Sequence, residues 1–258
     1  MSVKQLFDLH GRAAIITGGS RGLGLQIAEA LGEMGAKLAL TARKKDELDH
    51  AVAQLAKSGI TAHAYACDIG KRDSIPGVFD QMLAKLGRVD ILVNNAGATW
   101  GAPAEDHPLE AWDKLVNLNL VGNFIMAQQA AKKAMIPAKW GRIVNVASVA
   151  GLYASDPAVV RTVSYNATKH GVVGMTKQLA AEWGEHGITV NAICPGFFPS
   201  KMTKATLDTM GEAMRMATPT RRLGGPEDLK GLAVLLASDA SRHITGQAIA
   251  VDGGAMLI

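Results

Sequence analysis

The chain has 258 residues, of which 48% are hydrophobic and 19% are charged, and its formal net charge is +4. This composition allows a large core, and the scattered Lys and Arg residues give little support to nucleic-acid binding. Two cysteines cannot form a disulfide framework, and we find neither an apolar leader nor an apolar stretch of membrane-spanning length. We therefore expect a cytoplasmic protein without a nucleic-acid partner, a membrane partner or a metal ion.

Short apolar segments alternate with longer helical patterns along the whole chain, as in parallel sheets covered on both faces. The predicted strands are Ala13–Thr17, Lys37–Thr41, Thr61–Ala66, Ile91–Asn94, Arg142–Ala147, Thr189–Ile193 and Ala248–Val251. The predicted helices are Leu23–Met34, Lys45–Lys57, Ser74–Leu86, Leu109–Met135, Tyr165–His186 and Pro226–Leu236. The alternation predicts one α/β domain over residues 1–258, a doubly wound Rossmann fold with a seven-stranded parallel sheet and helices on both faces.

The first predicted strand runs directly into the sequence TGGSRGLG at residues 17–24. Glycines at 18, 22 and 24 depart from the spacing of the common dinucleotide fingerprint, but they serve the same physical need. They permit a tight turn and a close approach of the backbone to a diphosphate, and the following helix offers free N–H groups. A plain tight turn is the alternative. The flanking strand and helix favour nucleotide binding.

The end of the second predicted strand indicates which dinucleotide binds. Sites for NAD usually carry an acidic residue there for the ribose hydroxyls. This chain has Ala42, followed by Arg43 and Lys44, and Arg21 lies within the glycine turn. Guanidinium groups suit a 2′-phosphate, although Arg43 and Lys44 could also be solvated charges at the start of a helix. The missing acid favours NADP(H).

Tyr165 and Lys169 are four residues apart in a predicted helix and therefore share one of its faces. A nearby ammonium is expected to lower the pKa of a phenol, so that the pair can exchange a proton with an alcohol oxygen. Ser148, after the fifth predicted strand, can donate a hydrogen bond to the same oxygen. For the pair alone, an interfacial tyrosine and a snorkelling lysine would be the better interpretation.

Further motifs extend this pattern along the chain. In addition to TGGSRGLG and Ser148, they are CDI at 67–69, NNAG at 94–97, Asn119 in NLNLVG, YNATK at 165–169, NAICPG at 191–196 and VDGG at 251–254. In this order they resemble the classical short-chain dehydrogenases/reductases over essentially the whole length. The resemblance implies a homotetramer and a catalytic tetrad of Asn119, Ser148, Tyr165 and Lys169.

In that family the tyrosine is the acid/base and the serine orients the carbonyl group. The lysine holds the nicotinamide ribose, and the asparagine anchors a water that leads to the lysine. Together, the glycine turn, the basic residues and the resemblance assign cofactor binding to Gly18, Ser20, Arg21, Gly22, Leu23, Arg43, Asp68, Ile69, Asn95, Ala96, Gly97, Tyr165, Lys169, Pro195, Gly196, Phe198 and Ser200.

Residues 198–220 are methionine-rich and follow the strand whose end meets the nicotinamide, which favours a substrate lid, with ordinary helix packing as the alternative. The 16 residues between Ser148 and Tyr165 form a longer segment than most relatives have, and we expect it to bulge over the site. The candidate substrate residues are Trp100, Tyr153, Phe197 and Met202. A partly apolar substrate follows from these side chains.

Two branches of the family are similar to this chain, the 3-oxoacyl-[acyl-carrier-protein] reductases and the gluconate 5-dehydrogenases. The apolar lid and the NADP prediction favour reduction of a 3-oxoacyl thioester, carried on acyl carrier protein or CoA. A keto-sugar acid or polyol oxidoreductase is the alternative within the family. A non-catalytic nucleotide sensor is the alternative outside it, and the intact tetrad argues against a sensor.

Overall fold

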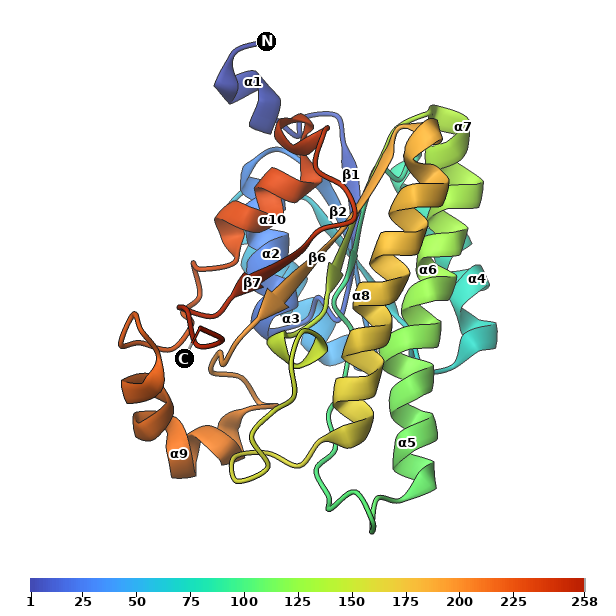
Figure 1. Cartoon of the computed structure of the whole chain (residues 1–258). Helices are drawn as coiled ribbons and strands as arrows, with labels where there is room; N and C mark the ends of the chain where they lie inside the picture. The colour runs from blue at the N-terminus through green and yellow to red at the C-terminus, as the bar shows by residue number, and fades with distance from the viewer. Residues whose placement is uncertain (258) are drawn as a thin grey trace.

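The computed structural model describes residues 1–257, which form a three-layer α/β fold around one parallel sheet (Figure 1). The seven strands run in the order β3-β2-β1-β4-β5-β6-β7, and every neighbouring pair is parallel. Their bounds are β1 Ala13–Thr17, β2 Lys37–Ala42, β3 Ala62–Ala66, β4 Ile91–Asn94, β5 Gly141–Val146, β6 Ile188–Pro195 and β7 Ala248–Val251. The fold class predicted from the sequence is confirmed, and strand bounds differ from the prediction by at most two residues.

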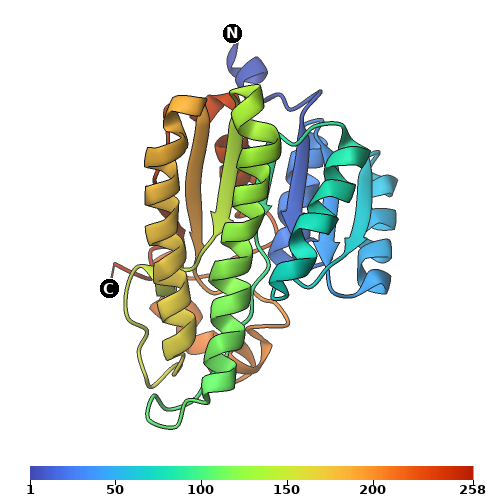
Figure 2. The same ribbon diagram turned by 90° about the vertical axis from the view of Figure 1, so that its right-hand side faces the viewer.

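The two faces of the sheet are covered by different helices (Figures 1 and 2). One face carries α2 (Gly22–Glu33), α3 (Lys45–Lys57) and α10 (Lys230–Ala237). The other carries α4 (Ile75–Leu86), α6 (Gly122–Ala130) and α8 (Val163–Trp183). Most strand residues in the middle of the sheet are buried, which explains why they are apolar throughout rather than alternating.

The remaining helices differ in part from the sequence prediction. The long helix predicted over 109–135 is one continuous rod of α5 (Leu109–Leu115), the π-helical η2 (Val116–Val121), α6, the π-helical η3 (Ala131–Met135) and α7 (Ile136–Ala138). Residues 226–229 form turns, so α10 begins four residues later than predicted. Two helices lay outside the prediction, α1 (Val3–Phe7) and α9 (Lys204–Ala217).

Strand order reverses between β1 and β4, and this reversal opens a crevice at the carboxyl edge of the sheet. Crossovers from β1 lead outward toward β2 and β3, whereas those from β4 lead the other way toward β7. Nucleotides bind at such a switch point in open parallel sheets. At the same edge, α9 faces the irregular segment that precedes α8 (Figures 1 and 2). Within residues 1–257, no helix combines the length and the apolar character needed to cross a membrane.

Candidate active site

A cavity of about 530 Å³ follows the carboxyl edge of the sheet. It is lined by the glycine turn after β1, the ends of β2, β4, β5 and β6, and the first residues after β6. Every residue that the sequence assigned to cofactor binding lines this one cavity. The structure therefore brings together residues that lie up to 182 positions apart, from Gly18 to Ser200.

The glycine turn is fixed by neighbouring backbone and by one asparagine. Gly18 and Gly22 have φ angles of +65° and +55°, a region that favours glycine. A Cβ atom on Gly18 would lie 2.8 Å from the Nδ2 of Asn95, whereas one on Gly22 would meet nothing within 4 Å. Asn95 donates from Nδ2 to the carbonyls of Thr17 and Gly18, both at 3.0 Å. The side chain of Asn95 thus holds the turn in place, and open space remains above Gly22.

Three cations line one end of the cavity, Arg21, Arg43 and Lys44. Ala42 lies beside them, where an acidic residue would otherwise contact a ribose. Glu47, in the first turn of α3, lines the same end and was not found by the sequence reasoning. An acidic residue in the first turn of a helix is common, so the sequence does not distinguish Glu47 from a residue that only interacts with the helix dipole.

Tyr165, Lys169 and Ser148 line the opposite end of the cavity. Both Tyr165 and Lys169 belong to α8, and the Lys169 ammonium lies 5.6 Å from the centre of the tyrosine ring. Lys169 is only 4% exposed, and its Nζ donates to the carbonyl of Val146 at 2.8 Å. Ser148 follows β5 and accepts a hydrogen bond from the backbone N–H of Ala150 at 3.1 Å. Hydroxyl, phenol and ammonium are therefore brought together by two elements.

Burial has opposite effects on the two titrating groups. It lowers the pKa of Lys169 to about 8, because the ammonium loses its hydration. Burial also raises the pKa of Tyr165, although a hydrogen bond with Ser148 acts in the lowering direction. The expectation that Lys169 lowers the pKa of the phenol is wrong for this arrangement. Burial dominates there, and the ammonium is bound to a backbone carbonyl rather than lying at the phenol oxygen.

Asn119 does not line the cavity but lies directly behind it, fully buried in η2. Its side-chain Oδ1 accepts from the N–H of Ala98, and its Nδ2 donates to the carbonyl of the same residue, both at 2.9 Å. The side chain of Asn123 donates to the carbonyl of Asn119 at 2.7 Å. This last contact caps a carbonyl within the π-helical turn, and sequence reasoning gave no signal for it.

Known proteins resemble this chain over nearly its full length. A family model described as enoyl-(acyl carrier protein) reductase matches residues 18–256. A D-threitol dehydrogenase from Mycolicibacterium smegmatis is 38% identical, covering 98% of this chain and 96% of its own length. A 3-oxoacyl-[acyl-carrier-protein] reductase from Aquifex aeolicus is 34% identical, with shares of 95% and 98%. The crystal structure of a gluconate 5-dehydrogenase from Burkholderia cenocepacia, in complex with NADP and tartrate, superposes with a TM-score of 0.93 at 33% identity and covers both chains completely.

The chain belongs to the short-chain dehydrogenase/reductase family. Members of this family use a nicotinamide dinucleotide. The open space above Gly22, the free start of α2 and the cationic end all suit a phosphorylated dinucleotide. When bound, this cofactor would supply or accept the hydride. The side chains of Tyr165, Ser148 and Lys169 can then transfer a proton at the carbonyl oxygen, orient that oxygen and hold a ribose.

The substrate end of this short-chain dehydrogenase/reductase contains few of the side chains predicted for it. Of the four predicted substrate residues, Met202 lines the cavity, whereas Trp100, Tyr153 and Phe197 do not. Trp100 and Tyr153 are exposed, at 45% and 39%. Among residues 1–257, the cavity lining includes none of positions 149–164, the segment before α8.

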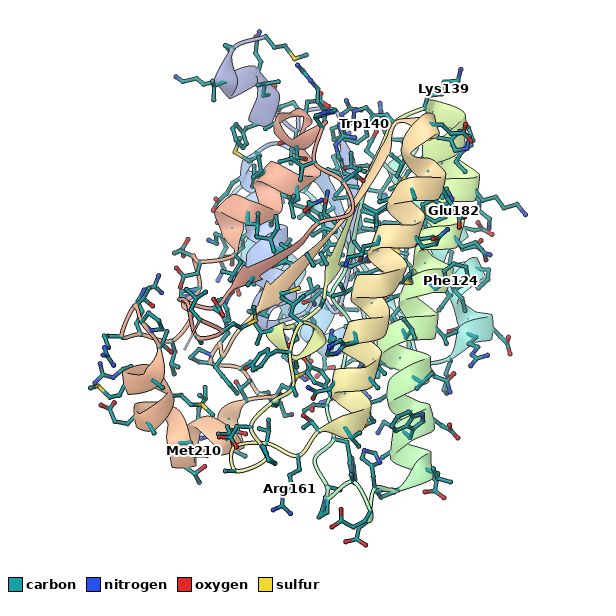
Figure 3. All side chains as sticks on the ribbon, in the orientation of Figure 1. Phe124, Lys139, Trp140, Arg161, Glu182 and Met210 are labelled. Carbon is teal, nitrogen blue, oxygen red and sulfur yellow. The ribbon has the colours of Figure 1, made fainter. Side chains whose placement is uncertain are left out.

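That segment instead binds the loop after β4. The N–H of Ala102 donates to the carbonyl of Arg161 at 2.9 Å, which joins the two loops. The Arg161 side chain points away from the body of the molecule, and Met210 lies on α9 (Figure 3). Thr203 and Lys201 line the cavity and were missed, since nothing in the lid sequence distinguishes them from surface residues.

Proposed function

We propose that the protein is an NADPH-dependent oxidoreductase that interconverts a carbonyl compound and its alcohol. The observation that carries this proposal is the single cavity that contains the Ser148, Tyr165 and Lys169 side chains at one end and a cationic adenosine end at the other. A non-catalytic nucleotide sensor would have no use for a phenol and an ammonium buried beside the nicotinamide end. Membership of the short-chain dehydrogenase/reductase family also supports an oxidoreductase.

The choice of NADPH over NADH rests on Arg21, Arg43 and Lys44, and on Ala42 in place of an acid. It is also supported by the related gluconate 5-dehydrogenase, which was crystallised in complex with NADP. Replacing Arg43 with alanine should weaken NADPH binding about 10- to 100-fold and NADH binding less than about twofold, because only NADPH carries the 2′-phosphate.

Fluorescence titration of both cofactors measures this difference. Lys45→Ala is the matched control, because Lys45 lies two residues further on and pairs with Asp49 on the surface of α3. Equal losses of the two cofactors on replacing Arg43 would overturn the NADPH proposal.

For the substrate, we propose a 3-oxoacyl thioester first. Its support is Met202, which lines the cavity and is 45% exposed, and the methionine-rich helix α9 that follows it, in which Met216 is 48% exposed. These flexible side chains can accommodate an acyl chain. A 3-oxoacyl-[acyl-carrier-protein] reductase is also among the relatives.

A polyol or keto-sugar acid is the second candidate, favoured by the similarity to a D-threitol dehydrogenase and a gluconate 5-dehydrogenase. The deciding experiment is steady-state oxidation of NADPH with acetoacetyl-CoA and with 5-ketogluconate, offered separately to purified protein. Turnover with the thioester alone supports the first candidate. Turnover with the keto-sugar acid alone overturns it and makes the polar residues of the lid, Ser200, Lys201 and Thr203, the first to replace.

A further inference from the structure

Glu47 is the one carboxylate that lies among the cations at the adenosine end of the cavity. Its Oε1 lies 3.0 Å from an Arg21 guanidinium nitrogen and 3.2 Å from the Lys44 ammonium, and its Oε2 lies 3.5 Å from the Ser20 hydroxyl. All four side chains line the cavity. Burial opposes ionisation, but the hydrogen bond from Lys44 and the charge of Arg21 outweigh it and lower the pKa of Glu47. The group is therefore a carboxylate at neutral pH.

A purely structural role does not account for this position. Acidic residues in the first turn of a helix interact favourably with its dipole, but Asp46 supplies that interaction equally well. Asp46 does not line the cavity, whereas the Glu47 side chain is 26% exposed and reaches across from α3 to the glycine turn. Glu47 thus forms ion pairs with two of the three cations that would bind the 2′-phosphate of NADPH. Arg43 lies outside this cluster of Glu47, Arg21 and Lys44.

We propose that Glu47 is an internal competitor of the cofactor's 2′-phosphate and limits the preference of this enzyme for NADPH over NADH. The inference rests on the proposed use of NADPH. To contact Arg21 and Lys44, a 2′-phosphate must displace the Glu47 carboxylate. The two groups repel each other because both are negatively charged. NADH brings no such phosphate, so the cluster of Glu47, Arg21 and Lys44 stays intact and neutralises cations that would otherwise be unpaired beside a ribose.

The test compares Glu47→Gln with the wild type in fluorescence titrations of NADPH and NADH. Glutamine keeps the size and hydrogen-bonding capacity of the side chain and removes its charge. We expect NADPH to bind about three- to tenfold more tightly and NADH to change less than about twofold. The gain should shrink when the salt concentration rises from about 0.05 M to about 0.5 M, since these charges are partly exposed.

Asp46→Asn is the matched control, because it removes the same charge from the same helical turn without facing the cavity. It should change the binding of either cofactor less than about twofold. A second variant, Glu47→Ala, repeats the test without the amide, and a thermal unfolding curve for each variant verifies that it is folded.

Weaker NADPH binding by Glu47→Gln would overturn the proposal and would mean that Glu47 positions Arg21 for the phosphate. An equal gain for both cofactors, or the same gain from Asp46→Asn, would also overturn it, since the effect would then be one of overall charge. The Arg43→Ala experiment separates this failure from that of the NADPH proposal. If Arg43→Ala weakens NADPH selectively and Glu47→Gln changes nothing, only the competition by Glu47 is wrong.

Discussion

The two edges of the parallel sheet differ in whether their charged side chains face a cavity. At the carboxyl edge, Arg43 and the phenol of Tyr165 face a cavity of about 530 Å³. At the amino edge, the charges are bound to one another. Asp90, just before β4, has a side chain only 3% exposed, and it accepts hydrogen bonds from Arg12 at 3.2 Å, from Arg88 at 2.7 Å and from the N–H of Ala13 at 2.9 Å.

A second cluster completes the amino edge around Trp140, which is labelled in Figure 3. The guanidinium groups of Arg12 and Arg142 lie 3.7 and 4.2 Å from the centre of its ring system. The indole N–H and Arg142 both donate to Asp239, at 3.1 and 3.0 Å. Arg142 is 2% exposed and also donates to the carbonyl of Ser238. These residues join the starts of β1 and β5 to the end of α10.

The difference separates charges that serve function from charges that serve stability. Groups at the carboxyl edge are arranged for a ligand, so their replacement should change catalysis or binding and leave the fold largely intact. Groups at the amino edge already have their partners, so their replacement should change the free energy of unfolding and leave the chemistry intact. Variants at each edge can test one side of this comparison.

The largest effect is expected from Tyr165→Phe, which removes the only hydroxyl proposed to transfer a proton to the substrate. Turnover should fall about 10²- to 10⁴-fold, while binding of NADPH and the melting temperature change little. Steady-state kinetics with the better of the two proposed substrates measures it.

Tyr65→Phe is the matched control, since Tyr65 lies in β3 and packs against the core on the α4 side. Near-normal turnover by the Tyr165→Phe protein would remove the tyrosine from its proposed role and would weaken the assignment of function to the carboxyl edge.

A smaller effect, and one of stability, is expected from Asp90→Ala at the amino edge. The change leaves Arg12, Arg88 and the N–H of Ala13 without their shared acceptor, and the free energy of unfolding should fall by about 2–4 kcal/mol. Urea denaturation at fixed protein concentration measures it. The folded protein should keep its kcat.

Asp80→Ala provides the comparison for Asp90→Ala. Asp80 is 58% exposed and pairs with Lys133 on the surface, so its loss should cost less than about 1 kcal/mol. Equal losses for the two variants would mean that burial of Asp90 adds nothing. A fall in the kcat of folded Asp90→Ala protein would contradict the separation of the two edges.

The fold was predictable from the sequence because each element is short and encoded locally. Buried strands such as Ala13–Thr17 are apolar throughout, and helices such as Lys45–Lys57 carry their own pattern. The start of α10 was misplaced because Pro226 is typical of a first helical turn, yet the salt-bridged Asp228 holds this stretch in turns. The π-helical turns of η2 and η3 were not predicted, because an apolar helical pattern does not distinguish a π-helical turn from an α-helical one.

The site was predictable where its residues lie at strand ends, because parallel strands bring those ends to one edge. This accounts for Ser148 after β5 and for the residues after β6. The substrate side was less predictable, because Trp100, Tyr153 and Phe197 lie on irregular segments whose course depends on long-range contacts. Glu47 was missed because an acidic first turn is common in helices, and only the folded chain shows that it faces Arg21.

Lys169 provides the finest test of the comparison, because this cation at the carboxyl edge is buried about as deeply as Arg142 at the amino edge. Its pKa is about 8 in the folded protein, against an ordinary lysine pKa of 10.5 in the unfolded chain. Between these values the unfolded chain binds more protons, so the lysine makes the free energy of unfolding rise with pH there. Below about pH 8 both states are charged, and the cost of burying the ammonium is present in full.

The Lys169→Met substitution removes that cost. The free energy of unfolding of the variant, relative to that of the wild type, should therefore be greatest near pH 7. The relative gain should shrink by about 1–3 kcal/mol as the pH approaches about 10, as measured by urea denaturation. Lys177→Met, at an exposed position of α8, should show no such change. The difference in free energy of unfolding between Lys169→Met and wild type could instead stay the same at both pH values, or increase with pH. Either result would show that the ammonium is not destabilised in the folded protein. In that case the hydrogen bond to the Val146 carbonyl would compensate for burial of the Lys169 ammonium as fully as Asp239 does for Arg142. The two edges would then differ less than their geometry indicates.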